Sequence, residues 1–210
     1  MVIILFVHVV IRAALQMIQN QIMNCHVDDA LEQINQAGYG AHYMLIYPDL
    51  DTLRELYSNY IHNQIEDNNE IILINPFYET TDSVRQVLSE KYNHGVNDIS
   101  RYEKEGALII ADSLKEYLSE QPHMRLKESS ANYTKMGKNG VSVLADLGAY
   151  PHKSMYKELV DYELSLPTKY DKQMKGYCLY HQKDFDKLSE EQKQKLIGHH
   201  GNVLKIVETQ

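Results

Sequence analysis

Short apolar runs alternate along this chain with segments whose apolar residues recur every three or four positions. The runs have the length of buried strands, and the wider spacing is typical of amphipathic helices. The expected strands span residues 42–47, 70–75, 106–111, 141–145, 177–180 and 203–207. Strands that alternate with helices predict a three-layer α/β fold, with a mostly parallel sheet and helices on both of its faces.

The expected helices begin near residues that can cap them. Asp49 and Asp51 can cap a helix that continues to Ile65, and Ser189 can cap one that continues to Ile197. Further helices are expected over residues 27–36, 81–92 and 155–164, with a weaker one over 130–136. Glycines at positions 38 and 40 end the first helix and provide the one candidate boundary. We therefore divide the chain into an N-terminal extension, residues 1–37, and a domain, residues 38–210.

Residues 1–18 are strongly apolar and are interrupted by His8 and Arg12. The uninterrupted part is short for a membrane span, and the segment lacks the charge pattern and cleavage site of a secretory signal. Three interpretations stay open: a helix that packs on the domain or a partner, a start assigned too far upstream, and a weak membrane anchor. Met17 and Met23 are alternative starts.

The composition limits the compartment and the partners. A formal net charge of −8, with lysines spread among acidic residues, disfavours direct nucleic-acid binding. The two cysteines, Cys25 and Cys178, are far apart and form no CxxC motif. We therefore expect a cytoplasmic protein, without a disulfide framework and without a membrane-bound role. Cys178 lies inside an expected strand and is predicted to be a buried thiol.

Ligands of a doubly wound sheet bind beyond the carboxyl ends of its strands. The turn after the first strand, residues 47–52, has no Gly or Lys and carries two carboxylates, which would repel a phosphate. With no phosphate loop, ATP hydrolysis is not expected, and we predict neither an enzyme nor a bound cofactor. Asp146 follows an apolar strand, where a metal-binding acid of an ATPase would lie, or it caps the next loop.

The chain has ten histidines, but no pair has the spacing of a metal-binding motif. We therefore predict no metal site, although histidines distant in sequence can meet in space. For His42, a hydrogen bond at the strand start and a ligand contact both stay open. His199 and His200 are expected to act as cations at a helix C-terminus.

Several ordered segments resemble the MEDS domain, the methanogen and methylotroph sensory domain first named for the dichloromethane repressor. The resemblance covers about residues 38–207 and is most specific in the His-Tyr strand, the Tyr-Glu helix before YCLY and the His before NVL. The matching segments are GAHYMLIYPDLDTLRELYSNYI, QIEDNNEIILIN, ALIIADSLKEYL, VSVLADLGAY, YKELVDYELSLP, GYCLYHQKDF and IGHHGNVL.

The resemblance implies a degenerate relative of RecA- and KaiC-type ATPases, with a RecA-like sheet from which the phosphate loop has been lost. It further implies a non-catalytic sensory role for a small organic, hydrocarbon-like molecule, in signal transduction or transcriptional control. Family members are often fused to a DNA-binding or histidine-kinase module. No helix-turn-helix is recognisable in the first forty or so residues here, so a separate signalling or regulatory protein is the expected partner.

Residues at the strand ends and at the positions matched to the family are the candidate ligand contacts. The candidates are His42, Tyr47, Asp49, Asp146, Tyr180 and His200. Two other functions stay open. One is a degenerate, ATPase-like nucleotide binder, and the other is a protein–protein interaction module that forms a homodimer.

Overall fold

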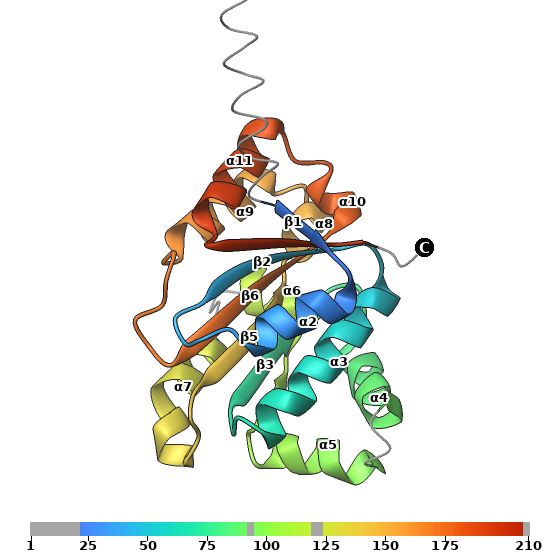
Figure 1. The fold of residues 1–210 in the computed structure, drawn as a ribbon, viewed down its shortest axis with the longest axis vertical. Coiled ribbons are helices and arrows are strands. Elements are labelled where there is room, and N and C mark those ends of the chain that lie inside the picture. Colours follow the sequence, from blue (N-terminus) through green and yellow to red (C-terminus); the bar gives the residue numbers. More distant parts are fainter. Residues whose placement is uncertain (1–21, 92–94, 119–123, 208–210) are drawn as a thin grey trace, which may run out of the picture.

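The computed structural model describes residues 22–91, 95–118 and 124–207 (Figure 1). The apolar segment of residues 1–18 lies outside this range. The described residues form one seven-stranded sheet with the order β1-β7-β2-β6-β5-β3-β4, in which all neighbours are parallel. The predicted α/β fold is confirmed. The strands are β1 Ile22–Cys25, β2 His42–Tyr47, β3 Ile71–Asn75, β4 Leu108–Ile110, β5 Val141–Asp146, β6 Met174–His181 and β7 Asn202–Ile206.

Helices cover both faces of the sheet, one half of the chain on each face (Figure 1). From β1 to β4 the chain crosses the sheet in one direction, and from β4 to β7 it returns, so right-handed crossovers place the two sets of helices on opposite faces. The first face carries α2 Val27–Asn35, α3 Leu50–Glu66, α4 Thr81–Lys91 and α5 Gly95–Lys104. The second carries α6 Ser113–Leu118, α7 Met124–Asn132, α8 Ala149–His152, α9 Tyr156–Ser165, α10 Gln182–Phe185 and α11 Glu190–His199.

The central strands are buried on both faces, which explains their continuous apolar sequence. All six residues of β2 are buried. Because side chains alternate along a strand, Leu45 and Tyr47 pack in the core under α2 and α3. Met44 and Ile46 pack in the other core, under α9 and α11. His42 has the same parity as Met44, and it therefore faces the second set of helices.

Several elements differ from the expectation. The sequence did not predict β1, α5, α6, α8 or α10. Strand β1 pairs with β7, Ile22 opposite Val203, so the part of the expected extension that the structure describes contributes β1 to the sheet and α2 to the layer of helices on its first face. The weak helix expected over residues 130–136 is instead the end of α7 followed by a 3₁₀ turn, Tyr133–Met136. In the described part of the chain, no helix combines the length and hydropathy of a membrane span.

A capping box fixes the start of α11, as the sequence predicted for Ser189. The backbone N–H of Gln192 donates to Ser189 Oγ at 3.2 Å, and the backbone N–H of Ser189 donates to Gln192 Oε1 at 2.9 Å. We expect Ser189→Ala to lower the free energy of unfolding by about 1 kcal/mol, measured by urea denaturation. The control Ser100→Ala, on the exposed face of α5, should leave it unchanged or raise it slightly, since alanine favours helix. Equal losses in both variants would contradict a capping role.

Candidate functional site

Four buried side chains that can bind metals meet between the sheet and helices α9 and α11. His42 begins β2, Cys178 lies in the middle of β6, Glu163 is on α9 and His200 follows α11. One donor atom from each residue lies within 4.8 Å of the other three. None of the four residues exceeds 6% exposure. We call this group the His-Glu-Cys cluster.

Local structure explains why these side chains converge. His42 and Cys178 lie on adjacent parallel strands, and both point toward the same layer of helices. Glu163 occupies the inner face of α9 with Leu159 and Val160, which makes it an acid in an otherwise apolar stripe. His200 is the C-cap of α11, and its backbone N–H donates to the carbonyl of Leu196.

Glu163 is the centre of the cluster's contacts. Its Oε2 lies 3.3 Å from His200 Nε2, 3.9 Å from His42 Nε2 and 3.5 Å from Cys178 Sγ. Its other oxygen, Oε1, accepts a hydrogen bond from the Tyr180 hydroxyl at 2.9 Å. His42 Nε2 lies 3.3 Å from Cys178 Sγ. One carboxylate oxygen is thus held by tyrosine, and the other faces both imidazoles and the thiol.

Backbone carbonyls orient both imidazole rings. His42 Nδ1 lies 3.0 Å from the carbonyl of Pro167, and His200 Nδ1 lies 2.8 Å from that of Leu196. A carbonyl can only accept, so in each ring Nδ1 carries the hydrogen. The Nε2 atoms therefore point toward Glu163 and Cys178.

Burial determines the protonation states of the cluster. Burial and the neighbouring ring of His200 lower the pKa of His42 to about 4. Burial, reinforced by the charge of Glu163, raises the pKa of the Cys178 thiol well above its ordinary value. Burial acts to raise the pKa of Glu163 too, but the hydrogen bond and charge of a protonated His200, the charge of a protonated His42 and the Tyr180 hydroxyl oppose burial and lower that pKa. At neutral pH, His42 is neutral and Cys178 is a thiol.

A cavity of about 270 Å³ adjoins the cluster on the same face of the sheet. Cys178 lines it, and the ring of Tyr170, another lining residue, lies 5.3 Å from the ring of His42. Asn75 supplies a polar group: its Nδ2 donates to the Tyr117 hydroxyl at 3.1 Å, while its buried Oδ1 has no hydrogen-bond partner among the described residues. The remaining lining includes the apolar and aromatic residues Val143, Ala145, Met174, Tyr117 and Tyr162 and the charged residues Glu116, Lys127, Asp171 and Lys172.

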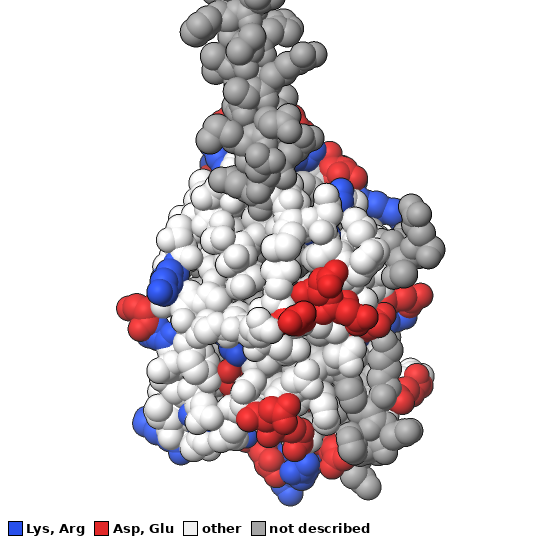
Figure 2. Space-filling model, in the orientation of Figure 1, with Lys and Arg blue, Asp and Glu red and all other residues white. Residues whose placement is uncertain are grey.

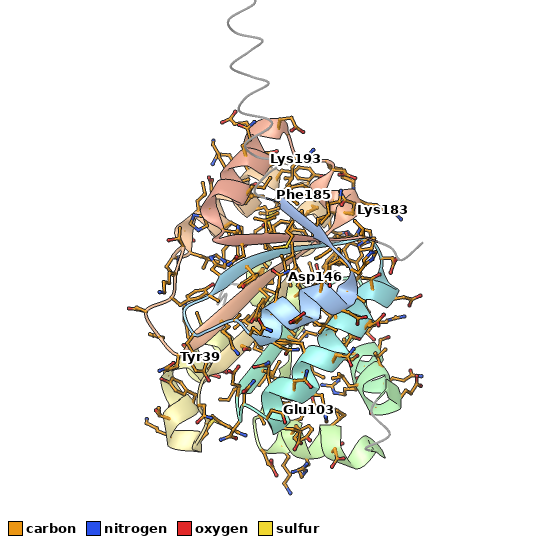
Figure 3. All side chains as sticks on the ribbon, in the orientation of Figure 1. Tyr39, Glu103, Asp146, Lys183, Phe185 and Lys193 are labelled. Atoms are coloured by element: carbon orange, nitrogen blue, oxygen red, sulfur yellow. The ribbon has the colours of Figure 1, made fainter. Side chains whose placement is uncertain are left out.

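The carboxyl ends of the strands form a separate network around Asp146, which lies among the side chains in the middle of the molecule (Figure 3). The Tyr47 hydroxyl donates to Asp146 Oδ2 at 2.8 Å, and the backbone N–H of Gly148 donates to Oδ1 at 2.9 Å. Burial raises the pKa of Asp146 to about 7, although these hydrogen bonds oppose the shift. Asp49 caps α3, as predicted, by accepting the backbone N–H of Thr52 at 2.8 Å.

The six candidate contacts thus separate into groups. The structure brings His42, Tyr180 and His200 together around Glu163. It brings Tyr47 and Asp146 into contact with each other, and it places Asp49 at the N-terminus of α3. Whether any of them binds a ligand stays a prediction.

Sequence reasoning missed Glu163 as a site residue. It predicted Cys178 to be a buried thiol, which is confirmed, but gave it no part in a site. An acid at a position that helical spacing assigns to the buried face was the signal available for Glu163.

The segment of residues 41–200 matches the family model of MEDS, the MEthanogen/methylotroph, DcmR Sensory domain. This segment includes all four residues of the His-Glu-Cys cluster and most of the sheet. A comparison with curated proteins finds no match. Because the family model covers most of the chain, this protein belongs to the MEDS family of sensory domains.

Proposed function

We propose that this protein is a non-catalytic sensor that binds a small organic molecule in the cavity beside Cys178. The observation that carries the proposal is the cavity itself, whose mainly apolar and aromatic lining also includes the charged residues Glu116, Lys127, Asp171 and Lys172. Asn75 Oδ1 adds an acceptor that has no hydrogen-bond partner among the described residues. Small-molecule sites typically combine an apolar lining with a few polar groups that orient the ligand. The family match supports a sensory role.

The size of the cavity limits the ligand. An apolar cavity of about 150 Å³ is large enough to bind benzene. The cavity here, at about 270 Å³, accommodates a molecule of that size or somewhat larger. The rings of Tyr117, Tyr162 and Tyr170 offer apolar contact, and Asn75 favours a ligand with an O–H or N–H group.

The proposed output is a change in contacts with a separate signalling or regulatory protein, or with a second copy of the chain. The cavity is lined by α6, α7, α9 and the segment that leads from α9 to β6, so a bound molecule contacts elements that reach the surface. On the face drawn in Figure 2, basic side chains are scattered among groups of acidic ones. With a net charge of −8, this distribution favours a protein partner over nucleic acid.

Nucleotide binding is the less favoured function. At the N-terminus of α3, where a phosphate would bind, the Asp49 carboxylate already accepts the N–H of Thr52. The acidic side chains of Asp49 and Asp51 repel a phosphate there.

Thermal denaturation with a panel of small organics tests the proposal. The panel contains methanol, dichloromethane, benzene, phenol and aniline. We expect at least one compound to raise the Tm of the wild type by several degrees, since binding to the native state alone at about 100 times Kd adds about 2.7 kcal/mol. Ala145→Leu, which fills the cavity from β5, should abolish that shift.

Val143→Ala is the matched control, because it enlarges the same cavity from the same strand. It should retain the shift relative to its own ligand-free Tm. A wild-type Tm that no compound changes, or a shift that persists in Ala145→Leu, would contradict ligand binding in this cavity.

A further inference from the structure

We propose that the His-Glu-Cys cluster is a buried site for one divalent transition-metal ion, with Zn²⁺ as the ion that fits it best. The ligands are His42 Nε2, His200 Nε2, Glu163 Oε2 and Cys178 Sγ. This inference goes beyond the proposed organic-ligand function and stands without it. The two share a boundary at Cys178, which belongs to the cluster and also lines the cavity.

The donor atoms already have nearly tetrahedral separations. Bonds of about 2.0–2.3 Å around a tetrahedral zinc place neighbouring donors about 3.3–3.8 Å apart. The separations here are 3.3 Å from His200 Nε2 to Glu163 Oε2, 3.3 Å from His42 Nε2 to Cys178 Sγ and 3.5 Å from Cys178 Sγ to Glu163 Oε2. His42 Nε2 is 3.9 Å from Glu163 Oε2, and the other pairs lie within 4.8 Å. Small side-chain shifts suffice to close the site.

The orientation of the rings supplies an independent argument. Both Nδ1–H groups donate to backbone carbonyls, of Pro167 and Leu196, so both Nε2 lone pairs point inward. Metal-binding histidines use the same second hydrogen bond to fix the ring and its tautomer. His200 Nε2 is fully buried and lies 3.3 Å from Glu163 Oε2 without the alignment of a hydrogen bond. A metal ion between these electron-rich atoms would satisfy them together.

The surroundings of Glu163 also fit a single bond to a metal. The Tyr180 hydroxyl donates to Oε1 at 2.9 Å, whereas the donor to Oε2 is the Cys178 thiol at 3.5 Å, a proposed ligand that loses its hydrogen when it binds the metal. Binding of the metal displaces the proton of the Cys178 thiol to solvent. The dication then balances that thiolate and the Glu163 carboxylate, while two neutral imidazoles add no charge, so the loaded site is neutral. Neutrality matters because an uncompensated charge is costly at a site this deeply buried.

The ligand types select the metal. Imidazole suits zinc, copper, iron and nickel, and a thiolate favours the softer of these ions. Four protein ligands in a tetrahedron, with no donor position open to solvent, are typical of a structural zinc site. The ion would connect β2, β6, α9 and α11, and so it would join helices α9 and α11 to the sheet.

The test uses the full chain, loaded with Zn²⁺ or with Co²⁺ as a spectroscopic substitute. We expect one Zn²⁺ per chain by mass spectrometry of the metal after dialysis. The Co²⁺ form should show the visible bands of a tetrahedral site and a thiolate-to-cobalt charge-transfer band. Cys178→Ser should lose the charge-transfer band and most of the bound zinc. Cys25→Ser, the matched control at the other buried cysteine, should keep both.

X-ray absorption of the zinc-loaded wild type tests the proposal without any variant. We expect one sulfur and three nitrogen or oxygen neighbours, with the scattering pattern of two imidazoles. Zinc bound with no sulfur neighbour would overturn the proposal, as would a wild type that keeps no metal after loading. A charge-transfer band that survives in Cys178→Ser, or is lost in Cys25→Ser, would overturn it too.

Discussion

Replacing Lys175 with methionine is expected to lower the free energy of unfolding by about 3–5 kcal/mol. Lys175 Nζ lies 2.8 Å from Glu70 Oε1, and the two side chains are only 4% and 2% exposed. Methionine fills the space of the lysine stem but leaves the Glu70 carboxylate buried without a counter-charge. Urea denaturation, followed by circular dichroism, measures the loss.

Two controls separate the buried charge from other effects. The double variant Lys175→Met/Glu70→Gln should recover most of the loss, because it removes both charges and leaves Ser142 to bond the new amide. Lys157→Met breaks a pair with Asp161 on the surface of α9, and it should lower the free energy of unfolding far less than Lys175→Met does. If Lys175→Met and Lys157→Met lowered the free energy of unfolding by the same amount, the buried pair would contribute no more to stability than the surface pair.

Asp146 should make the protein less stable as the pH rises from about 4 to about 7. Its pKa is raised from 3.8 to about 7 by burial in the native state, so over this range the folded chain keeps a proton that the unfolded chain has lost. Stability therefore falls with pH, by up to about 4 kcal/mol from this residue alone. Relative to wild type, the Asp146→Asn variant should be least stable near pH 4, and the difference in the free energy of unfolding should shift in its favour toward pH 8.

The comparison with asparagine isolates this titration from others. Asparagine keeps an oxygen that can accept the N–H of Gly148, so the variant retains the main backbone contact of the site. Asp51→Asn, whose side chain is exposed on α3, controls for the loss of one negative charge. If the free energies of unfolding of wild type and Asp146→Asn, each plotted against pH, ran parallel from pH 4 to pH 8, the result would contradict a raised pKa at Asp146.

The fold could be predicted where burial left a pattern in the sequence. Strands β2, β3 and β5 are buried on both faces, and each stands out as a continuous apolar run. Strand β1 gave no such signal, because it is an edge strand in which only Cys25 is buried. Helix α5 was missed because, among its described side chains, Ile99 is the one buried in the core and Tyr102 packs against it, so few apolar residues mark its period.

The site could be predicted only in part, for reasons of distance along the chain. Tyr47 and Asp146 were both placed by the rule that strand ends converge, and they do contact each other. The meeting of His42 with His200 depends on where α11 ends relative to the first residue of β2, which no local pattern encodes. Glu163 was read as one residue of a helix. Its spacing from Leu159 and Val160 indicates the buried face, but only the packing of α9 shows which side chains it meets there.

The position of β7 in the sheet has a consequence for synthesis on the ribosome. Strand β1 emerges before the other described strands, yet its neighbour among them is β7, which also pairs with β2 on its other side. While the middle of the chain is being translated, β2 can begin to pair as soon as β6 has emerged, but Ile22–Cys25 has no strand to join. Strand β1 must therefore wait for Asn202–Ile206, and these two strands enter the sheet together as the last step in the assembly of the described fold.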